Sequence, residues 1–186
     1  MYKYRSAIFR VIAGSDASST IGTAFATGRF SLLTCYHVVD GINTIGILDN
    51  QGVSKTITSI KNPANPKEMD LSIIYIEEEN LHYLPLHTST DDPTVYNLMG
   101  YITGDTSKEA STYKLAARER KDVQYDEYNL PEAIELVGDI VGSGLSGSPL
   151  INPNNGCVSA IFCGGNPSLK RVWALPFSAI KHWDSF

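Results

Sequence analysis

The chain has 186 residues, a net charge of −5 and 42% hydrophobic side chains, which suits one large or two small folded domains. The acidic balance argues against a nucleic-acid partner, which would need a basic stripe, and no apolar stretch approaches the length of a membrane span. The first residues lack the apolar core and the small-residue cleavage site of a secretion signal, so we expect a cytoplasmic protein.

Short strand-like runs separated by turns fill the first half of the chain. The expected strands cover residues 4–12, 21–27, 30–34, 43–48, 53–60 and 70–77. Prolines and asparagines mark residues 62–69 as a loop. Strands that follow one another roughly every eight to twelve residues, with no helices between them, predict an all-β barrel or sandwich.

The second half begins after a loop at residues 84–94 and repeats this pattern. Its expected strands cover residues 95–104, 133–140, 148–152, 156–165 and 170–176. Residues 104–132 are rich in charges and fit either a hairpin or a short helix, and we expect strands there. The tail from Pro176 onward is expected to be a short helix, because proline is favoured near a helix start. The strand count suits two small β-barrels.

Three polar residues stand beside apolar runs and have catalytic potential as a set. His37 lies in LLTCYHVVDG, Asp70 opens DLSIIYIE, and Ser146 lies inside GSGLSGSPL. A serine hydroxyl needs a nearby base to act as a nucleophile, and histidine titrates near neutrality. A buried carboxylate holds such a histidine in one tautomer and stabilises its charged form. The three residues therefore suit nucleophilic hydrolysis.

The loop around Ser146 can supply further groups for that chemistry. A tetrahedral intermediate needs donors for its oxyanion, and the backbone N–H groups of Gly144 and Ser146 can provide them. Gly147 relieves crowding beside the nucleophile, and Pro149 stiffens the entry into the next strand.

Taken singly, each of these features has a plainer interpretation. His37 alone is equally well a core histidine, Asp70 alone is more simply a strand anchor, and the glycine-rich loop alone could be a turn. Asp40 follows His37 closely and could replace Asp70, although the next residue, Gly41, favours a turn. The joint occurrence of all three at strand edges favours the catalytic interpretation.

These segments together resemble the trypsin/chymotrypsin-like serine protease family. IGTAFATGRFSLLTCYHVV, MDLSIIYI and GLSGSPLIN carry the resemblance, and the His, Asp, Ser order is that of the family. Further matching blocks, including YNLMGYITG and the C-terminal stretch, are most like the compact bacterial members. The residue order does not fit an α/β-hydrolase or a subtilisin-like enzyme.

The resemblance implies a fold and a division of the chain. The fold is all-β, with two Greek-key six-stranded β-barrels and a short C-terminal helix. Residues 1–88 would form the first barrel, which carries His37 and Asp70. Residues 89–186 would form the second barrel, which carries Ser146 and the helix.

The resemblance also implies a reaction and a role for each residue. The chain would be a serine endopeptidase that cleaves peptide bonds through an acyl-enzyme intermediate. His37 would be the base, Asp70 its orienting acid and Ser146 the nucleophile. The N–H groups of Gly144 and Ser146 would form the oxyanion hole.

The substrate pocket follows from the same resemblance. Its floor would be Ile140, which suits an apolar or small side chain, although a shift of the loop path would place the neighbouring Asp139 there and favour a basic one. Its wall would be formed by Phe162, Cys163 and Gly164, where glycine leaves room for an extended peptide.

Leu145 departs from the pattern of the digestive members, which keep an aspartate there to pair with a freshly cut N-terminus. We therefore expect control by a partner protein or an appended domain instead of N-terminal cleavage. The expected partners are a protein or peptide substrate and such a regulator, with neither nucleic acid nor membrane. The alternative from another class is a catalytically silent protease fold that serves as a binding or scaffold module.

The three cysteines, Cys35, Cys157 and Cys163, show neither the disulfides of the family nor CxxC spacing. On one extended strand, Cys157 and Cys163 are too far apart to bridge. We expect reduced thiols, no metal site and no cofactor.

Overall fold

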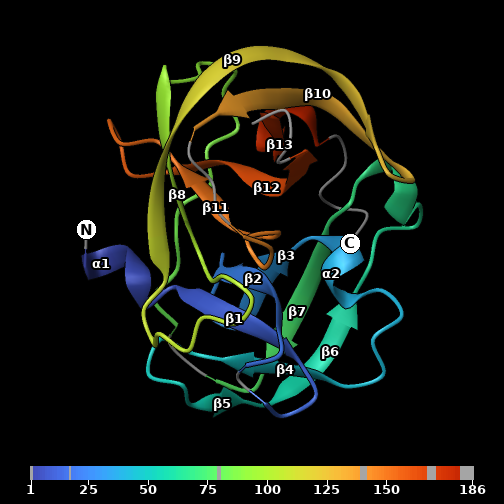
Figure 1. Cartoon of the computed structure of the whole chain (residues 1–186), viewed down its shortest axis with the longest axis vertical. Helices are drawn as coiled ribbons and strands as arrows, with labels where there is room; N and C mark the ends of the chain where they lie inside the picture. The colour runs from blue at the N-terminus through green and yellow to red at the C-terminus, as the bar shows by residue number, and fades with distance from the viewer. Residues whose placement is uncertain (1, 17, 79–80, 139–141, 167–170, 181–186) are drawn as a thin grey trace.

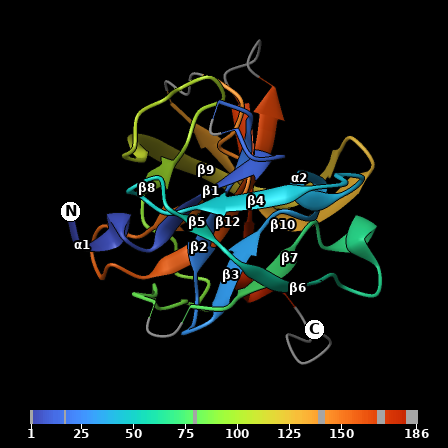
Figure 2. The same ribbon diagram turned by 90° about the horizontal axis from the view of Figure 1, so that it is seen from below.

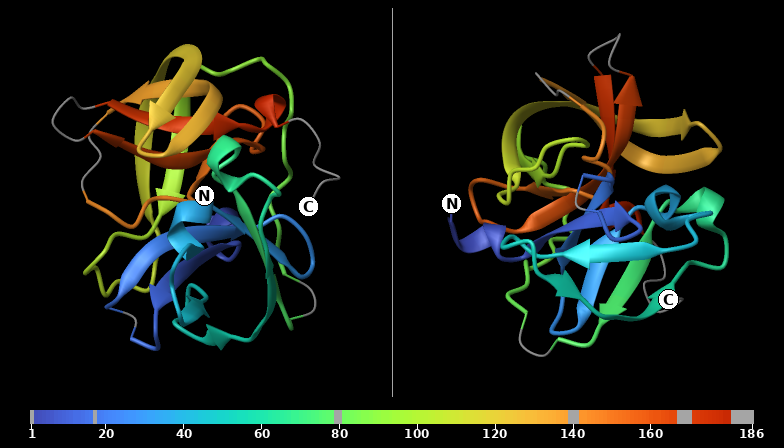
Figure 3. Two further views of the ribbon diagram at one scale, coloured as in Figure 1. Left: turned by 90° about the vertical axis from the view of Figure 1, so that its right-hand side faces the viewer. Right: turned by 60° about the horizontal axis from the view of Figure 1, so that its bottom comes forward.

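The computed structural model describes residues 2–16, 18–78, 81–138, 142–166 and 171–180. Two β units are stacked, the N-terminal half below the C-terminal half in Figure 1 and in the left panel of Figure 3. One sheet forms the first unit and a closed barrel forms the second. The all-β fold expected from the sequence is confirmed.

The N-terminal half folds into a seven-stranded sheet in the order β5-β4-β1-β2-β3-β7-β6. Its strands are β1 (Ile8–Ala13), β2 (Thr20–Ala26), β3 (Ser31–Thr34), β4 (Ile45–Leu48), β5 (Ser54–Lys55), β6 (Ile57–Lys61) and β7 (Ser72–Ile76). Figure 2 looks onto this sheet from below. Six strands are expected here, and the seventh arises because the run at 53–60 is interrupted at Thr56. β5 and β6 lie at opposite ends of the strand order, so Thr56 joins the two ends of the sheet and makes it barrel-like.

The C-terminal half is a closed six-stranded barrel in the order β10-β13-β12-β11-β8-β9. Its strands are β8 (Val95–Gly100), β9 (Ser111–Tyr125), β10 (Tyr128–Val137), β11 (Pro149–Ile151), β12 (Val158–Asn166) and β13 (Arg171–Pro176). β9 and β10 form a long hairpin, which confirms strands in the charged segment 104–132 from Ser111 onward, whereas residues 104–110 form no strand. In Figure 1 this hairpin arches over the barrel and ends beside α2 (Tyr36–Val39) and the 3-10 turn η1 (Pro66–Glu68).

The structures expected at the two ends of the chain need correction. The strand expected at 4–12 begins only at Ile8, because α1 (Tyr2–Arg5) forms a helical turn before it. At the other end, the described part of the expected terminal helix is the short 3-10 turn η3 (Phe177–Ala179), and residues 181–186 lie outside the described residues. Within the described chain, no helix has the length and apolar character needed to cross a bilayer.

Apolar residues from both halves are buried in two clusters. The larger cluster contains most of the core of the first sheet together with residues of β12 and β13, such as Ile161 and Leu175. The smaller cluster fills the second barrel around Tyr96 and Leu136. Each large apolar side chain that is fully buried contributes about 1.5–3 kcal/mol. Because the larger cluster contains residues of both halves, it fixes the two halves relative to each other. It thereby also positions the residues at their junction.

Candidate active site

The loop of residues 142–148 carries Ser146 and is tied to both β units. The Thr23 N–H donates to the carbonyl of Ser146 at 2.8 Å, and the Gly147 N–H donates to the carbonyl of Phe162 at 2.8 Å. The first bond anchors the loop to β2 and the second anchors it to β12. Ser146 therefore lies where the two units meet.

The hydroxyl of Ser146 is half-buried and donates to the backbone carbonyl of Cys163 at 3.0 Å. Cys163 lies in β12 and is fully buried. The serine side chain thus points across the junction toward β12. Its hydrogen bond is made by a hydroxyl that rotates freely, so the acceptor can change without movement of the backbone.

His37 lies in α2 and faces the carboxylate of Asp70. Its Nδ1 lies 3.0 Å from Asp70 Oδ1 and 2.9 Å from Oδ2, and its backbone N–H also donates to Oδ1 at 3.0 Å. Asp70 is completely buried, whereas the His37 side chain is 24% exposed. A carboxylate can only accept, so Nδ1 carries a proton and Nε2 is left for other chemistry. This is the contact that the sequence motif predicts for a base and its orienting acid.

Asp40, the rival acid, is engaged elsewhere. Its Oδ1 accepts a hydrogen bond from the hydroxyl of Tyr36 at 2.8 Å. The residue also ends α2, where its N–H donates to the carbonyl of Tyr36. The geometry around His37 therefore favours Asp70.

The two amides expected at the oxyanion hole are free of acceptors in the part of the chain that the structure describes. The carbonyls of the same residues are occupied, because the Gly144 carbonyl accepts from the Thr23 hydroxyl at 3.0 Å and the Ser146 carbonyl accepts from the Thr23 N–H. Gly144 has a φ of +96°, in the left-handed region that favours glycine. Thr23 was not recognised from the sequence, although it holds this loop at two points.

Leu145 is 1% exposed and packs in the apolar cluster of the second barrel. The loop is therefore anchored at this position by burial of an apolar side chain. The digestive members of the family use an ion pair with the N-terminus at this position, and burial of Leu145 takes its place here.

Two tyrosines at the tip of the β9–β10 hairpin surround His37 and were missed by the sequence analysis. The ring centroids of Tyr128 and Tyr125 lie 5.9 Å and 6.5 Å from that of His37, and Tyr125 also packs against Trp173 at 5.9 Å. A Cβ on Gly164 would come within 2.5 Å of the Tyr125 hydroxyl, so this hydroxyl lies directly against β12. The motif YDEY signals a turn in the sequence, but nothing in it indicates which residues the turn covers.

A surface ion pair links this hairpin tip to η1 of the first unit. Glu127 Oε2 lies 2.6 Å from Nζ of Lys67, which belongs to η1. Burial, with a smaller contribution from the negative charge of Asp70, raises the pKa of Tyr128 to about 12. The phenol is therefore protonated at neutral pH and adds no charge beside His37.

The expected pocket residues lie in different surroundings. Phe162 is 5% exposed and packs in the core of the second barrel, and Cys163 is fully buried. Gly164 faces Tyr125, as described above. Ile140 and the neighbouring Asp139 lie outside the described residues.

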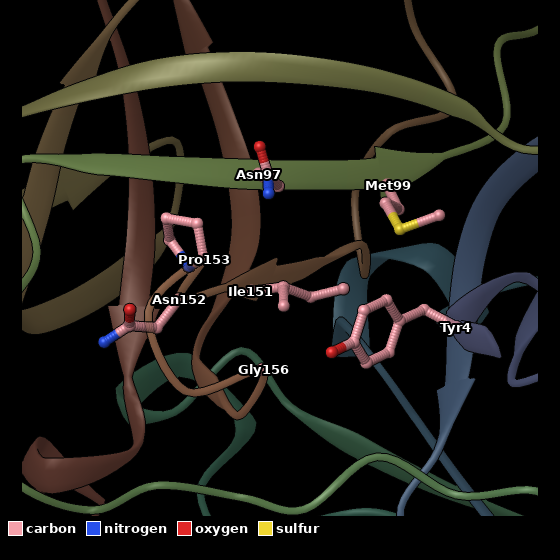
Figure 4. A pocket seen from close by; sticks show the side chains of 7 residues that line it. All are labelled: Tyr4, Asn97, Met99, Ile151, Asn152, Pro153 and Gly156. Carbon is pink, nitrogen blue, oxygen red and sulfur yellow. The ribbon is translucent and has the colours of Figure 1, made fainter. Parts of the chain in front are cut away.

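Two pockets open elsewhere, and neither is lined by His37, Asp70 or Ser146. They measure about 170 and 430 Å³, and both are bordered by Tyr4 and Gly156. Figure 4 shows the smaller one, with Asn97 and Met99 across from the Tyr4 ring. They are separate from the candidate catalytic residues.

One group of buried side chains has the donor atoms of a metal site. Sγ of Cys35, a carboxylate oxygen of Asp70 and Sγ of Cys163 all lie within 4.8 Å of one another. Burial, followed by the neighbouring Cys163, raises the pKa of the Cys35 thiol well above its ordinary value. All three cysteines are free thiols.

The chain is similar to a family of known proteins. A family model described as a trypsin-like peptidase domain matches residues 22–161, well over half of the chain. No curated protein matches the chain in sequence.

Several solved protease structures share the fold. The Rv3671c protease from M. tuberculosis, in its active form, is 17% identical with a TM-score of 0.76, over 94% of this chain and 78% of that one. The MamO protease domain from Magnetospirillum magneticum is 15% identical with a TM-score of 0.73, over 95% of both chains. A serine endoprotease from Yersinia pestis is 17% identical with a TM-score of 0.72, over 94% of this chain and 60% of that one. At these identities the likeness shows the fold.

Proposed function

This chain belongs to the family of trypsin-like peptidase domains, and on that basis we propose that it is a serine endopeptidase with His37, Asp70 and Ser146 as its catalytic triad. The observation that carries the proposal is the contact of His37 with the fully buried Asp70. A buried carboxylate that accepts from Nδ1 orients the imidazole and stabilises its cationic form during the reaction.

The first chemical step transfers the hydroxyl proton of Ser146. When a peptide binds, the hydroxyl turns from the Cys163 carbonyl toward His37 Nε2 and gives up its proton as Oγ attacks the peptide carbonyl carbon. The tetrahedral intermediate then collapses, the C–N bond breaks, and the proton on Nε2 passes to the leaving amine. A water molecule releases the acyl group from Oγ by the same steps in reverse order.

The amides of Gly144 and Ser146 would stabilise the negative charge of the tetrahedral intermediate. Their lack of an acceptor among the described residues supports this role. Removal of one such donor in other enzymes typically costs about 10²–10³ in kcat. In this protein, Thr23 would hold both amides in place through its bonds to the two adjacent carbonyls.

Substrate and control are further parts of the proposal. An extended peptide would lie along β12 near Gly164, with Cys163 contributing backbone and Ile140 the apolar floor. The backbone N–H and carbonyl of Phe162 are already bonded to Ser148 and Gly147, so Phe162 would line the wall without pairing with the peptide. We propose the two halves, 1–88 and 89–186, as the two barrels of one catalytic domain. Leu145, buried in the core, replaces the ion pair with a cut N-terminus, so control would come from a partner protein or an appended domain in a cytoplasmic setting.

The alternative, a silent protease fold used for binding, is favoured by two observations. The Ser146 hydroxyl is bonded to Cys163, and tyrosine rings cover His37, as a resting or inactive site would show. The reactivity of Ser146 distinguishes the two functions. An endopeptidase would be labelled at this serine by an activity probe, whereas a silent module would not.

We expect a fluorophosphonate probe to label the protein at Ser146 and a peptide library to be cleaved. Ser146→Ala should abolish labelling and lower kcat/KM by about three orders of magnitude or more, because triad members act as a unit. Ser143→Ala is the matched control, since it removes an exposed hydroxyl from the same loop and should leave labelling unchanged. Absence of labelling in the native chain, with candidate regulators present, would favour the silent module.

A further inference from the structure

Three buried side chains from both β units meet next to His37, which contacts one of them, Asp70. Cys35 lies between β3 and α2, Asp70 lies two residues before β7 begins, and Cys163 lies in β12. All three have no exposed surface. Their sulfur and oxygen atoms lie within 4.8 Å of one another, so two thiols and a carboxylate face a common point.

We propose that Cys35, Asp70 and Cys163 form an inhibitory site for a thiophilic divalent cation of the Zn²⁺ class. Two sulfurs bound tetrahedrally to zinc at about 2.3 Å lie about 3.8 Å apart, so the present separation needs side-chain adjustments of at most about 1 Å. Sulfur donors select Zn²⁺ or Cd²⁺ over Mg²⁺ and Ca²⁺, which prefer oxygen.

The present hydrogen bonds of the thiols are weak enough to be exchanged for metal bonds. Cys35 Sγ donates to the Phe162 carbonyl at 3.2 Å, and Cys163 Sγ donates to the Ile161 carbonyl at 3.6 Å. Binding of one cation replaces the two S–H bonds by two metal–sulfur bonds and releases two protons to the solvent. No oxidant or reductant is needed.

The cation would inhibit the proposed peptidase activity because it binds the carboxylate of Asp70, which His37 also contacts. Both carboxylate oxygens now lie within 3.0 Å of His37 Nδ1. A divalent charge on this carboxylate neutralises it and repels the imidazolium that forms when His37 accepts a proton. This inhibitory effect rests on the proposed catalytic function, whereas binding of the cation does not.

Binding is tested by titrating the whole chain with Cd²⁺ and following the ultraviolet charge-transfer absorption of cadmium–thiolate bonds. We expect one Cd²⁺ per chain, competition by Zn²⁺ and none by Mg²⁺. Cys35→Ser and Cys163→Ser should each lose most of the absorption and bind at least about tenfold more weakly, because each removes a sulfur ligand. Cys157→Ser is the matched control, since Cys157 is a free thiol outside the cluster and its removal should leave the absorption unchanged.

Serine preserves the size of each cysteine and can donate to the same carbonyl, and circular dichroism with a thermal unfolding curve checks that every variant folds. Should Cys35→Ser fail this check, Cys35→Ala replaces it. Full absorption in both cluster variants, or its loss in Cys157→Ser, would overturn the proposed site.

A second measurement isolates the inhibition from the binding. Zn²⁺ should slow fluorophosphonate labelling of the native chain and of Cys157→Ser, and about tenfold more Zn²⁺ should be needed for the same slowing in the cluster variants. Stoichiometric Cd²⁺ binding with unchanged labelling would refute the inhibitory role. A chain that is never labelled contradicts the proposed function and leaves the absorption titration as the decisive test of the metal site.

Discussion

Two separate constraints exclude any side chain at Gly147, next to the candidate nucleophile. Its φ of +86° lies in the left-handed region, which other residues adopt at a cost. A Cβ there would also collide with the Thr23 carbonyl and with the hydroxyl of Thr34. The close approach of the loop to β2, which positions Ser146, is possible only because this residue has no side chain.

We expect Gly147→Ala to destabilise the chain by about 3 kcal/mol or more, because backbone strain and steric overlap add. Gly104→Ala is a matched control with a φ of +80° and no atom within 4 Å of the new Cβ, and it should cost about 1 kcal/mol. Urea unfolding measures both. Equal losses of stability in the two variants would show that the left-handed backbone conformation alone requires glycine at position 147. The close contact with β2 would then not contribute.

At the scale of the elements, the β9–β10 hairpin gives this site its particular shape. Alternation along β9 places Tyr125 toward His37 and Gly164, whereas the adjacent Gln124 is exposed. An extended peptide that pairs with β12 would pass beside the ring of Tyr125. Under the proposed function, the hairpin would therefore limit the space available to a substrate residue beside Tyr125.

We expect Tyr125→Ala to raise kcat/KM for substrates with a bulky residue at that place, relative to a small one, by about tenfold. The physical reason is that the ring and hydroxyl occupy space that the bulky side chain needs. Gln124→Ala should leave the ratio unchanged, because its side chain faces solvent. The preference is measured with paired peptides, and an unaltered ratio in Tyr125→Ala would remove the tyrosine from substrate selection.

For the whole molecule, one buried cation links the two β units. Arg10 lies in β1 and is 4% exposed. Its guanidinium donates to the carbonyls of Asp105 and Ser107 in the second half, at 2.7 and 2.5 Å, and its Cζ lies 4.6 Å from the ring centroid of Tyr101. Because the candidate site is assembled from both halves, this link supports its geometry from a distance.

We expect Arg10→Met to lower the free energy of unfolding by about 2 kcal/mol or more, since hydrogen bonds to charged groups contribute about 1.5–3 kcal/mol each. Amide hydrogen exchange should rise in residues 102–109 more than elsewhere. Arg29→Met, at an exposed position, should change neither quantity. A uniform rise in exchange across the chain would contradict the specific link.

Several features of the site were accessible from the sequence, and others were not. His37 and Asp70 each stand beside an apolar run, so the sequence predicted them as a base and its orienting acid. The structure brings them into contact, and their catalytic role stays a prediction. Tyr125 and Tyr128 could not be assigned to the site, because their hairpin crosses to the opposite sheet and no local pattern specifies where its tip rests. The approach of Cys35 to Cys163 could not be predicted either, because the spacing of cysteines along the chain does not reveal which distant segments meet.

The sequence by itself determined the local structure: the alternation of apolar and polar residues, the turns and the glycines produced strands, and the His, Asp, Ser order pointed to the family. These properties depend on neighbours a few residues apart, which share backbone geometry. Only the tertiary structure decided that Cys35 meets Cys163, that Tyr128 covers His37 and that Leu145 anchors the nucleophile loop in an apolar core. Such contacts join distant segments, and they depend on how the N-terminal sheet and the C-terminal closed barrel pack against each other.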